Sequence, residues 1–278
     1  MKLVTFKSQG STSFGILRER EIIDLTPLAP DLISMLSAGS PEPAADGKRF
    51  PLSQVELLPP IPNPGKIVCV GLNYRSHLAL LDDPIPEVPI LFTKPNTSLI
   101  GSAGAIVLPC VTKQVDFEGE LAVVIGKKGK YISESAALDY VAGYTCANDV
   151  SAHDIEFRTS QWTSGKMLDT FCPLGPLLVT ADEIANPNEL RLSTVLNGQT
   201  MQDESTSDML FPVAKLISYI SSLATLEPGD IILTGTPAGL GCMRRPPAFL
   251  KPGDEISVEI EGIGRLANSV IAEARCAT

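Results

Sequence analysis

The chain has 278 residues and a mass of 29.6 kDa, with 44% hydrophobic and 19% charged residues. This balance is typical of a globular protein and excludes an extended disordered chain. The net charge of −10 arises from 22 basic and 32 acidic residues, and the basic residues form no cluster. Nucleic acid is therefore not an expected partner.

No apolar run approaches the roughly 20 residues that span a bilayer, so no membrane partner is expected. Residues 1–6 are too short an apolar stretch for the core of a signal peptide. We therefore predict an intracellular protein, with the cytoplasm favoured over mitochondria. The 6 cysteines are widely spaced without a C-x-x-C pair, which predicts reduced, mostly buried thiols rather than a zinc site or disulfides.

Residues 1–65 are predicted to form a small N-terminal α/β module that ends in a linker. Within it, residues 3–6 and 14–17 predict two short strands around a turn. Asp31 is typical of a helix N-cap and precedes the helical residues 32–36.

A loop predicted at residues 41–51 and a proline-rich linker at residues 58–65 complete this module. The linker places a domain boundary near residue 65, so residues 66–278 are predicted to form the catalytic domain. Many short strands, few helices and glycine-proline turns in this part favour a β-rich α+β fold.

The apolar residues 66–71 predict a buried strand that ends at a glycine. Asn73 is typical of an N-cap for a helix over residues 73–80, and the prolines of residues 81–89 turn the following chain into an irregular loop suited to a lid. His77, one of only 2 histidines, is either a surface residue of this connector or a functional group.

An acidic alternation leads into an unbroken apolar run at residues 115–126. In a strand, Asp116, Glu118 and Glu120 share one face, and the apolar residues 121–125 predict a strand that is covered on both faces. Carboxylates gathered without counter-charges are suitable ligands for a hard divalent cation. The alternative is a solvated strand face at a sheet edge.

Asp149 follows a second buried strand, which is predicted over residues 141–147. The connection from Glu120 includes a short predicted helix at residues 133–140 with Ser133 as its cap, and it is long enough for a helical crossover. Such a crossover places Asp149 beside the acidic strand. Asp149 is also compatible with a role as a helix N-cap.

Lys166 lies between a glycine and apolar residues, so it is either a desolvated cation that faces an anion or an ordinary solvated lysine. Residues 230–241 predict a strand followed by a glycine-rich turn, whose backbone N–H groups suit an anion. This turn lacks the G-K-[ST] ending of a phosphate-binding Walker loop.

Several motifs resemble, in order, those of the fumarylacetoacetate hydrolase family, and the similarity extends over the whole chain. The resemblance implies a mixed β-roll core, a small N-terminal domain and a homodimer. The motifs lie at residues 71–77, 92–95, 118–126, 148–152, 162–176 and 234–239.

The resemblance implies that Glu118, Glu120 and Asp149 bind Mg²⁺ or Mn²⁺, with Ca²⁺ as a possible substitute. It implies that Lys166 lies near the carboxylate or developing enolate of the substrate, and that His77 acts as the acid/base group of the lid. The residues implied to contact the substrate are Arg75, Glu156, Gly235 and Thr236.

Substrates of the family are small 2-oxo and β-diketo acids, so the resemblance implies a small anionic keto acid of the oxaloacetate or acylpyruvate kind. The implied reactions are C–C bond hydrolysis, decarboxylation and keto-enol tautomerisation. They share an enolate that a metal ion and a lysine stabilise.

Three positions depart from the family pattern. Leu80 stands where the lid commonly carries a glutamate that orients the histidine, and His153 and Glu156 replace a common arginine and glutamine. Loss of the glutamate weakens hydrolysis more than tautomerisation or decarboxylation, unless Asp82, Asp83 or Glu156 replaces it. These departures leave two alternative functions for the chain. One is a specialised lyase, isomerase or dehydratase of secondary metabolism, and the other is a catalytically silent metal- or ligand-binding protein.

Overall fold

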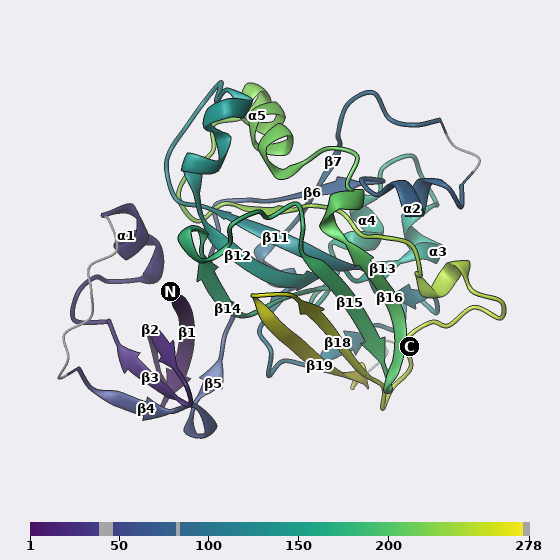
Figure 1. Ribbon diagram of the computed structural model, residues 1–278. Coiled ribbons are helices and arrows are strands. Elements are labelled where there is room, and N and C mark those ends of the chain that lie inside the picture. The colour runs from purple at the N-terminus through teal and green to yellow at the C-terminus, as the bar shows by residue number, and fades with distance from the viewer. Residues whose placement is uncertain (39–46, 82–83, 275–278) are drawn as a thin grey trace.

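The computed structural model describes residues 1–38, 47–81 and 84–274. A twelve-stranded mixed sheet crosses the molecule, and a five-stranded sheet packs against its middle (Figure 1). In spatial order the large sheet comprises β4 (Arg49–Pro51), β3 (Glu21–Asp24), β2 (Ser11–Arg18), β1 (Lys2–Ser8), β14 (Cys172–Thr180), β12 (Val141–Asn148), β11 (Gly119–Ile125), β17 (Ile231–Leu233), β6 (Ile67–Gly71) and β7 (Ile90–Lys94), with β5 (Glu56–Leu57) on β1 and β8 (Leu99–Ile100) on β14.

The smaller sheet and the helices complete the fold. The five strands are β16 (Gln199–Ser205), β15 (Arg191–Leu196), β18 (Glu255–Ile260), β19 (Gly264–Ala272) and β9 (Ile106–Leu108), and β10 (Val115–Asp116) pairs with β13 (Ser151–Ala152). The α-helices are α1 (Leu32–Ser37), α2 (Arg75–Leu78), α3 (His153–Glu156), α4 (Thr163–Lys166) and α5 (Val213–Leu223). The 3₁₀ helices are η1 (Leu52–Gln54), η2 (Asn96–Ser98), η3 (Glu134–Tyr140), η4 (Ala181–Glu183), η5 (Thr206–Asp208) and η6 (Gly241–Met243). Short helices beside large mixed sheets confirm the predicted α+β class.

Strand β11 is buried along its whole length, as its apolar run predicts. Leu121 and Val123 belong to the core cluster shared with α5 and the five-stranded sheet, whereas Ala122 and Val124 pack into a second cluster with β6 and the N-terminal residues. Both faces of the strand are therefore covered by apolar side chains, so its register is strongly fixed.

The predicted helical crossover between the two acidic motifs is wrong. Strands β11 and β12 are antiparallel neighbours, with Glu120 opposite Ala147, and the 3₁₀ helix η3 lies in their connection. Ser133 is the N-cap residue of η3, but its side chain makes no capping hydrogen bond. Asp149 still reaches the acidic strand, because its N–H donates to the carbonyl oxygen of Glu118 at 2.8 Å.

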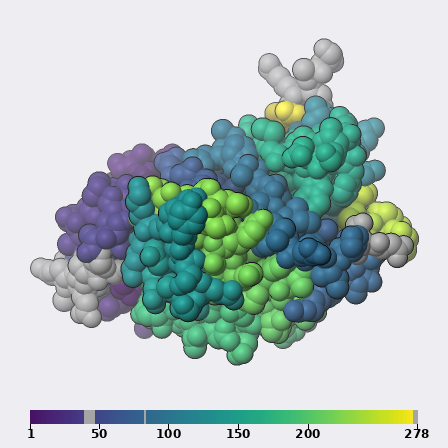
Figure 2. Space-filling model, turned by 90° about the horizontal axis from the view of Figure 1, so that it is seen from above, coloured from purple at the N-terminus to yellow at the C-terminus, as the bar shows by residue number. Residues whose placement is uncertain are grey.

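The N-terminal residues form one end of the molecule (Figures 1 and 2). Strand β1 pairs with β14, with Leu3 opposite Leu178, so the N-terminal strands continue the large sheet. Asp31 caps α1 by accepting from the N–H of Ser34 at 2.7 Å, which confirms that prediction. In the predicted loop at residues 41–51, residues 41–46 lie outside the described residues and Arg49–Pro51 is strand β4.

Asn73 holds three segments together and does not cap a helix. Its Nδ2 donates to the carbonyl oxygens of Phe211 and Thr234 at 3.1 and 2.7 Å, and its Oδ1 accepts from the N–H of Phe211 at 2.8 Å. Helix α2 follows with Tyr74 as its N-cap residue and is a single turn. The predicted helix over residues 73–80 is therefore shorter, because Asn73 bonds across the fold rather than along the chain.

The cysteine prediction is confirmed in part. Free thiols occur at Cys69, Cys146, Cys172 and Cys242, whereas Cys110 is disulfide-bonded, so the prediction is wrong for that residue. Among the described residues, no helix is long and apolar enough to cross a membrane.

Candidate active site

Three predicted metal ligands converge where two neighbouring strands meet. Glu118 directly precedes β11, Glu120 is its second residue, and Asp149 follows the end of β12. All three are buried, and one carboxylate oxygen from each lies within 4.8 Å of the others. The antiparallel pairing produces this arrangement, because it brings the beginning of one strand against the end of the other.

Two buried lysines lie against this acidic cluster. Lys166 Nζ lies 2.9 Å from Glu118 Oε1 and 3.1 Å from Asp149 Oδ2. Lys94 Nζ donates to Asp149 Oδ1 and to the carbonyl oxygen of Val150. Burial alone would raise the pKa of Asp149, but Lys166 and Lys94 hold it below its ordinary value.

The two glutamates show that these lysines do not neutralise the cluster. Burial raises the pKa of Glu118 to about 7, although Lys166 opposes the shift and Asp149 adds to it. The pKa of Glu120 is also raised, by burial and then by repulsion from Asp149 and Glu118. Glu120 Oε2 accepts from the N–H of Gly235 at 2.7 Å.

This donor set fits a divalent cation. Three buried carboxylates supply only oxygen ligands, which hard ions such as Mg²⁺ and Mn²⁺ prefer. Burial is the main cause of the raised pKa values of Glu118 and Glu120, and a divalent ion would stabilise both groups in the charged form. The sequence alternative of a solvated strand edge is wrong for these residues, because both are buried.

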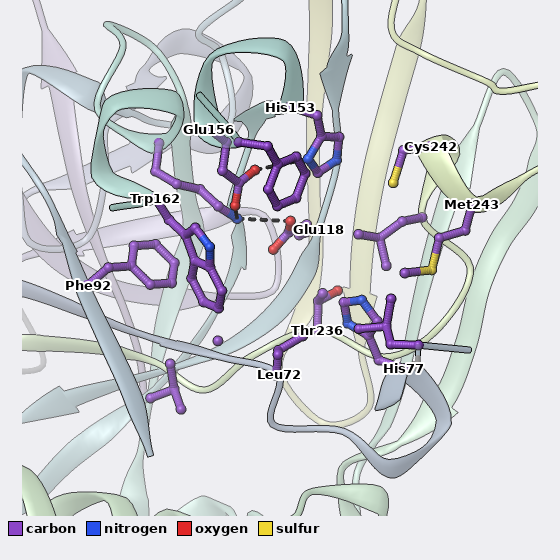
Figure 3. Close-up of a pocket in the computed structure, with 16 residues that line it drawn as sticks. Leu72, His77, Phe92, Glu118, His153, Glu156, Trp162, Thr236, Cys242 and Met243 are labelled. Carbon is purple, nitrogen blue, oxygen red and sulfur yellow. Dashed lines mark hydrogen bonds and ion pairs between the residues drawn. The ribbon is translucent and has the colours of Figure 1, made fainter. Parts of the chain in front are cut away.

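The cluster opens through Glu118 and Lys166 into a pocket of about 150 Å³ (Figure 3). A volume of this size suits a small organic acid rather than a large ligand. The other lining residues are Val70, Gly71, Leu72, His77, Leu81, Phe92, His153, Glu156, Phe157, Trp162, Thr236, Leu240, Cys242 and Met243.

His77 lies in helix α2 and lines this pocket with only 7% of its surface exposed. Burial lowers its pKa, the Thr236 backbone opposes the shift, and Lys166 adds to it. The ring is therefore held neutral, and its Nδ1 has no hydrogen-bond partner among the described residues. A neutral imidazole that lines a pocket and has an unpaired nitrogen is suited to accept a proton from a ligand.

Of the four residues implied to contact the substrate, two line the pocket and two do not. Thr236 and Glu156 line the pocket, whereas Arg75 and Gly235 do not. Arg75 donates to the carbonyl oxygens of Asp208 and Met209, so it anchors α2 instead. The Gly235 N–H bonds to a metal ligand, which makes this residue a support for the cluster.

Leu80 is 60% exposed, and its side chain has no hydrogen-bonding group that could orient the His77 ring as a glutamate would. Asp82 and Asp83 lie outside the described residues. Glu156 bonds to His153 at 2.9 Å rather than to the lid histidine.

Sequence reasoning assigned no role to two residues that support the site. Lys94 is a buried partner of Asp149, and its only sequence signal is its place in the motif at residues 92–95. Gln202 links the two sheets: its Oε1 accepts from the N–H of Gly119, and its Nε2 donates to Thr236 Oγ1. No local pattern distinguishes this glutamine from a surface residue on β16.

Asp116 does not join the metal cluster, although a continuous strand would place it on the same face as Glu118. The chain leaves β10 after Asp116 and begins β11 only at Gly119, so the alternation is interrupted. The Asp116 carboxylate instead accepts from the N–H groups of Gly241 and Cys242.

Comparison with known proteins agrees with this geometry. The fumarylacetoacetate (FAA) hydrolase C-terminal family matches residues 66–271, and an N-terminal family described as Rv2993c-like matches residues 1–60. The chain is 49% identical over 229 residues, 82% of its length, to "Oxaloacetate tautomerase Fahd2a, mitochondrial" of Rattus norvegicus, and covers 73% of that protein.

Two solved structures extend the comparison over the fold. Fumarylacetoacetate hydrolase from Exiguobacterium antarcticum superposes with a TM-score of 0.89 and 38% identity, covering 98% of this chain and 100% of the other. Maleylpyruvate hydrolase from Sphingobium sp. SYK-6, in complex with manganese(II) and pyruvate, superposes with a TM-score of 0.80 and 30% identity, covering 98% and 99%. The chain therefore belongs to the fumarylacetoacetate hydrolase family and has its fold.

Proposed function

We propose that this protein is a divalent-metal-dependent enzyme that interconverts the keto and enol forms of a small 2-oxo acid. The observation that carries the proposal is the convergence of Glu118, Glu120 and Asp149 with Lys166 at a small pocket that His77 also lines. When bound by the three carboxylates, a divalent ion supplies a Lewis acid for the carbonyl oxygen of a 2-oxo acid.

Lys166 supplies a fixed positive charge beside the position of the reacting oxygen. Its ammonium group is buried, and its pKa is raised because Asp149, Glu118 and Glu156 outweigh the effect of burial. A cation held in a water-poor pocket stabilises negative charge that develops on the substrate without reorganisation.

His77 is suited to the proton transfer. Tautomerisation removes a proton from C3 of the 2-oxo acid and adds one to the oxygen on C2. The neutral ring accepts the proton from C3 and then donates it to the oxygen on C2, and the reverse direction runs the same transfer backward. Hydrolysis requires an oriented water as well, and the exposed Leu80 cannot orient one.

One relative supports this choice of reaction, whereas the two solved structures compared above are named hydrolases. The rat protein is named an oxaloacetate tautomerase, and the Sphingobium structure holds pyruvate with manganese. We propose Mg²⁺ as the native ion and Mn²⁺ as a substitute, because both prefer oxygen ligands. Hydrolysis, decarboxylation and the specialised lyase or dehydratase reaction remain the alternatives for the same site.

To test the proposal, the absorbance of the enol form of oxaloacetate or acetylpyruvate is followed after addition of the protein, with and without a metal chelator. We expect turnover on the order of 1 s⁻¹ or faster with Mg²⁺ and little without it. Glu120→Gln should abolish Mg²⁺ binding in calorimetry as well as turnover, whereas Glu189→Gln on the surface should change neither. Turnover that survives both chelator and Glu120→Gln would contradict the proposal, and absence of turnover on every 2-oxo acid would favour a silent binding protein.

We further propose a homodimer, which the family resemblance implies. Light scattering on the full chain should give twice the mass of 29.6 kDa. A mass equal to that of one chain at micromolar concentration would contradict this.

A further inference from the structure

One wall of the pocket carries a fixed negative charge, the carboxylate of Glu156 (Figure 3). Glu156 is buried at the end of α3, and its Oε1 lies 4.0 Å from Lys166 Nζ. Helix α4 packs closely on α3 at this point, because a Cβ added to Gly165 would lie 2.5 Å from Glu156 Cβ. Since Lys166 also contacts Glu118, the wall carboxylate stands next to the candidate metal centre.

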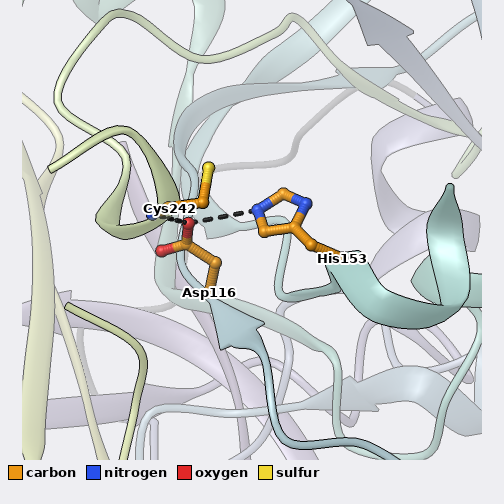
Figure 4. Close-up of side chains that lie close together, drawn as sticks. All are labelled: Asp116, His153 and Cys242. Atoms are coloured by element: carbon orange, nitrogen blue, oxygen red, sulfur yellow. Dashed lines mark hydrogen bonds and ion pairs between the residues drawn. The ribbon is translucent and has the colours of Figure 1, made fainter. Parts of the chain in front are cut away.

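Asp116 and His153 hold this carboxylate in place. His153 Nδ1 lies 2.9 Å from Glu156 Oε2, and its Nε2 lies 3.1 Å from Asp116 Oδ2 (Figure 4). The Asp116 carboxylate is fixed in turn by the N–H groups of Gly241 and Cys242, at 2.9 and 2.7 Å. The imidazole is therefore bound on both sides and cannot turn away from Glu156.

The same residues do not form a second metal site. Asp116, His153 and Cys242 lie close enough to be considered as ligands (Figure 4). However, both ring nitrogens already face carboxylates, and Asp116 accepts three backbone hydrogen bonds. Burial lowers the pKa of His153, but hydrogen bonds with Asp116, Cys242 and Glu156 outweigh it and raise the pKa to about 12. The ring therefore keeps its second proton, and both of its nitrogens are donors rather than metal ligands.

Among its described lining residues, the pocket offers no free cation to a second negative charge on a substrate. Lys166 is shared among three carboxylates, His153 is bound on both sides, and His77 is held neutral. No arginine is present among the described lining residues. The apolar part of the lining consists of Val70, Leu72, Leu81, Phe92, Phe157, Trp162, Leu240 and Met243.

We propose that Glu156 is a specificity-determining residue of this pocket. It makes the pocket select 2-oxo acids with an uncharged distal end, such as acylpyruvates, over dicarboxylic acids such as oxaloacetate. The proposal rests on the proposed function and names its substrate class. In a pocket of about 150 Å³, no part of a five-carbon acid lies far from Glu156, so a distal carboxylate is repelled.

Acetylpyruvate and oxaloacetate are matched probes for this proposal. They share the 2-oxo acid half and differ at the distal end, where a methyl group replaces a charged oxygen. We would measure the dissociation constant of each, with Mg²⁺ present, by calorimetry on the full chain. We expect wild type to bind acetylpyruvate at least about tenfold more tightly.

Three variants separate charge from structure. Glu156→Gln removes the charge at nearly constant shape and should shift the affinity ratio toward oxaloacetate by about tenfold. Glu156→Asp keeps the charge and should keep the wild-type preference, and surface Glu189→Gln should behave as wild type. If Glu156→Gln fails to fold, Glu156→Met provides the same removal of charge.

Wild-type preference for oxaloacetate, or an affinity ratio unchanged by Glu156→Gln, would overturn the proposal. Binding is measured separately from turnover, so the two proposals fail differently. Absence of tautomerisation would contradict the proposed reaction, while the binding ratio would still decide the role of Glu156.

Discussion

At the scale of single residues, Lys166 is the buried cation that both lines the pocket and pairs with the acidic cluster. It contacts both a metal ligand and the wall carboxylate of the pocket. We expect Lys166→Met to lower kcat about 10²- to 10³-fold at saturating Mg²⁺, because charge developing on the substrate loses its buried counter-charge. Steady-state kinetics with a circular dichroism check of folding would measure this.

Lys215→Met is the matched control, because Lys215 is half exposed on helix α5, outside the pocket lining. It should leave kcat unchanged. A Lys166→Met variant with a wild-type kcat would mean that the lysine is only a structural counter-ion of the acidic cluster.

His153 carries a pH dependence of stability. Its pKa is about 12 in the folded chain against an ordinary value of 6.5, so the folded state holds the proton more tightly than the unfolded state. The resulting stabilisation is fully present below pH 6.5 and is lost as pH rises from there toward 12. We therefore expect His153→Asn to lower the free energy of unfolding more at about pH 6 than at about pH 9.

Urea denaturation of wild type and His153→Asn at both pH values measures this difference. Using the difference between the two proteins cancels the titration of the other groups. An equal loss at both pH values would show that His153 contributes packing rather than charge.

At the scale of elements, Gly119 lets the two sheets approach each other at the metal ligands. A Cβ at this position would lie 2.2 Å from Thr194 Oγ1 on β15 and 3.2 Å from Gln202 Oε1 on β16. We expect Gly119→Ala to lower the free energy of unfolding by roughly 1–3 kcal/mol and to weaken Mg²⁺ binding, because β11 must shift.

Thermal unfolding and calorimetry would measure both effects. Adding Thr194→Ala removes the hydroxyl that the new Cβ meets, so the double variant should recover part of the loss. Unchanged stability and Mg²⁺ affinity in Gly119→Ala would contradict this description of the contact between the sheets.

At the scale of the whole molecule, the N-terminal residues complete the large sheet. Strand β1 pairs with β14, and Leu3, Phe14 and Leu32 pack in the same core cluster as Ala122. We expect a chain lacking residues 1–60 to be less stable and to bind the dye ANS, because it exposes this cluster and an open strand edge.

Far-UV circular dichroism, thermal unfolding and ANS fluorescence on the shortened chain would test this. Independent folding with wild-type thermal stability would instead support a separate domain, as the predicted boundary near residue 65 and the family match to residues 1–60 suggest.

The sequence alone predicted the three acids that converge at the site, since acids at the ends of buried strands have a local signature. The apolar run after Glu120 predicted a covered strand, and the motifs predicted the family. Expectations about single helices and connections failed where local patterns compete with contacts between distant segments. Asn73 is a good N-cap by type, yet its side chain is used by Phe211 and Thr234, which are remote in sequence.

Only the tertiary structure decided how the acids divide between two groups. The alternation at residues 115–126 placed Asp116 with Glu118 and Glu120, but the break between β10 and β11 turns Asp116 toward His153. His153 and Glu156 appeared in the sequence as two separate departures from the family pattern. The fold joins them into one charged wall, because burial in a pocket makes each charge depend on a partner that no local sequence pattern specifies.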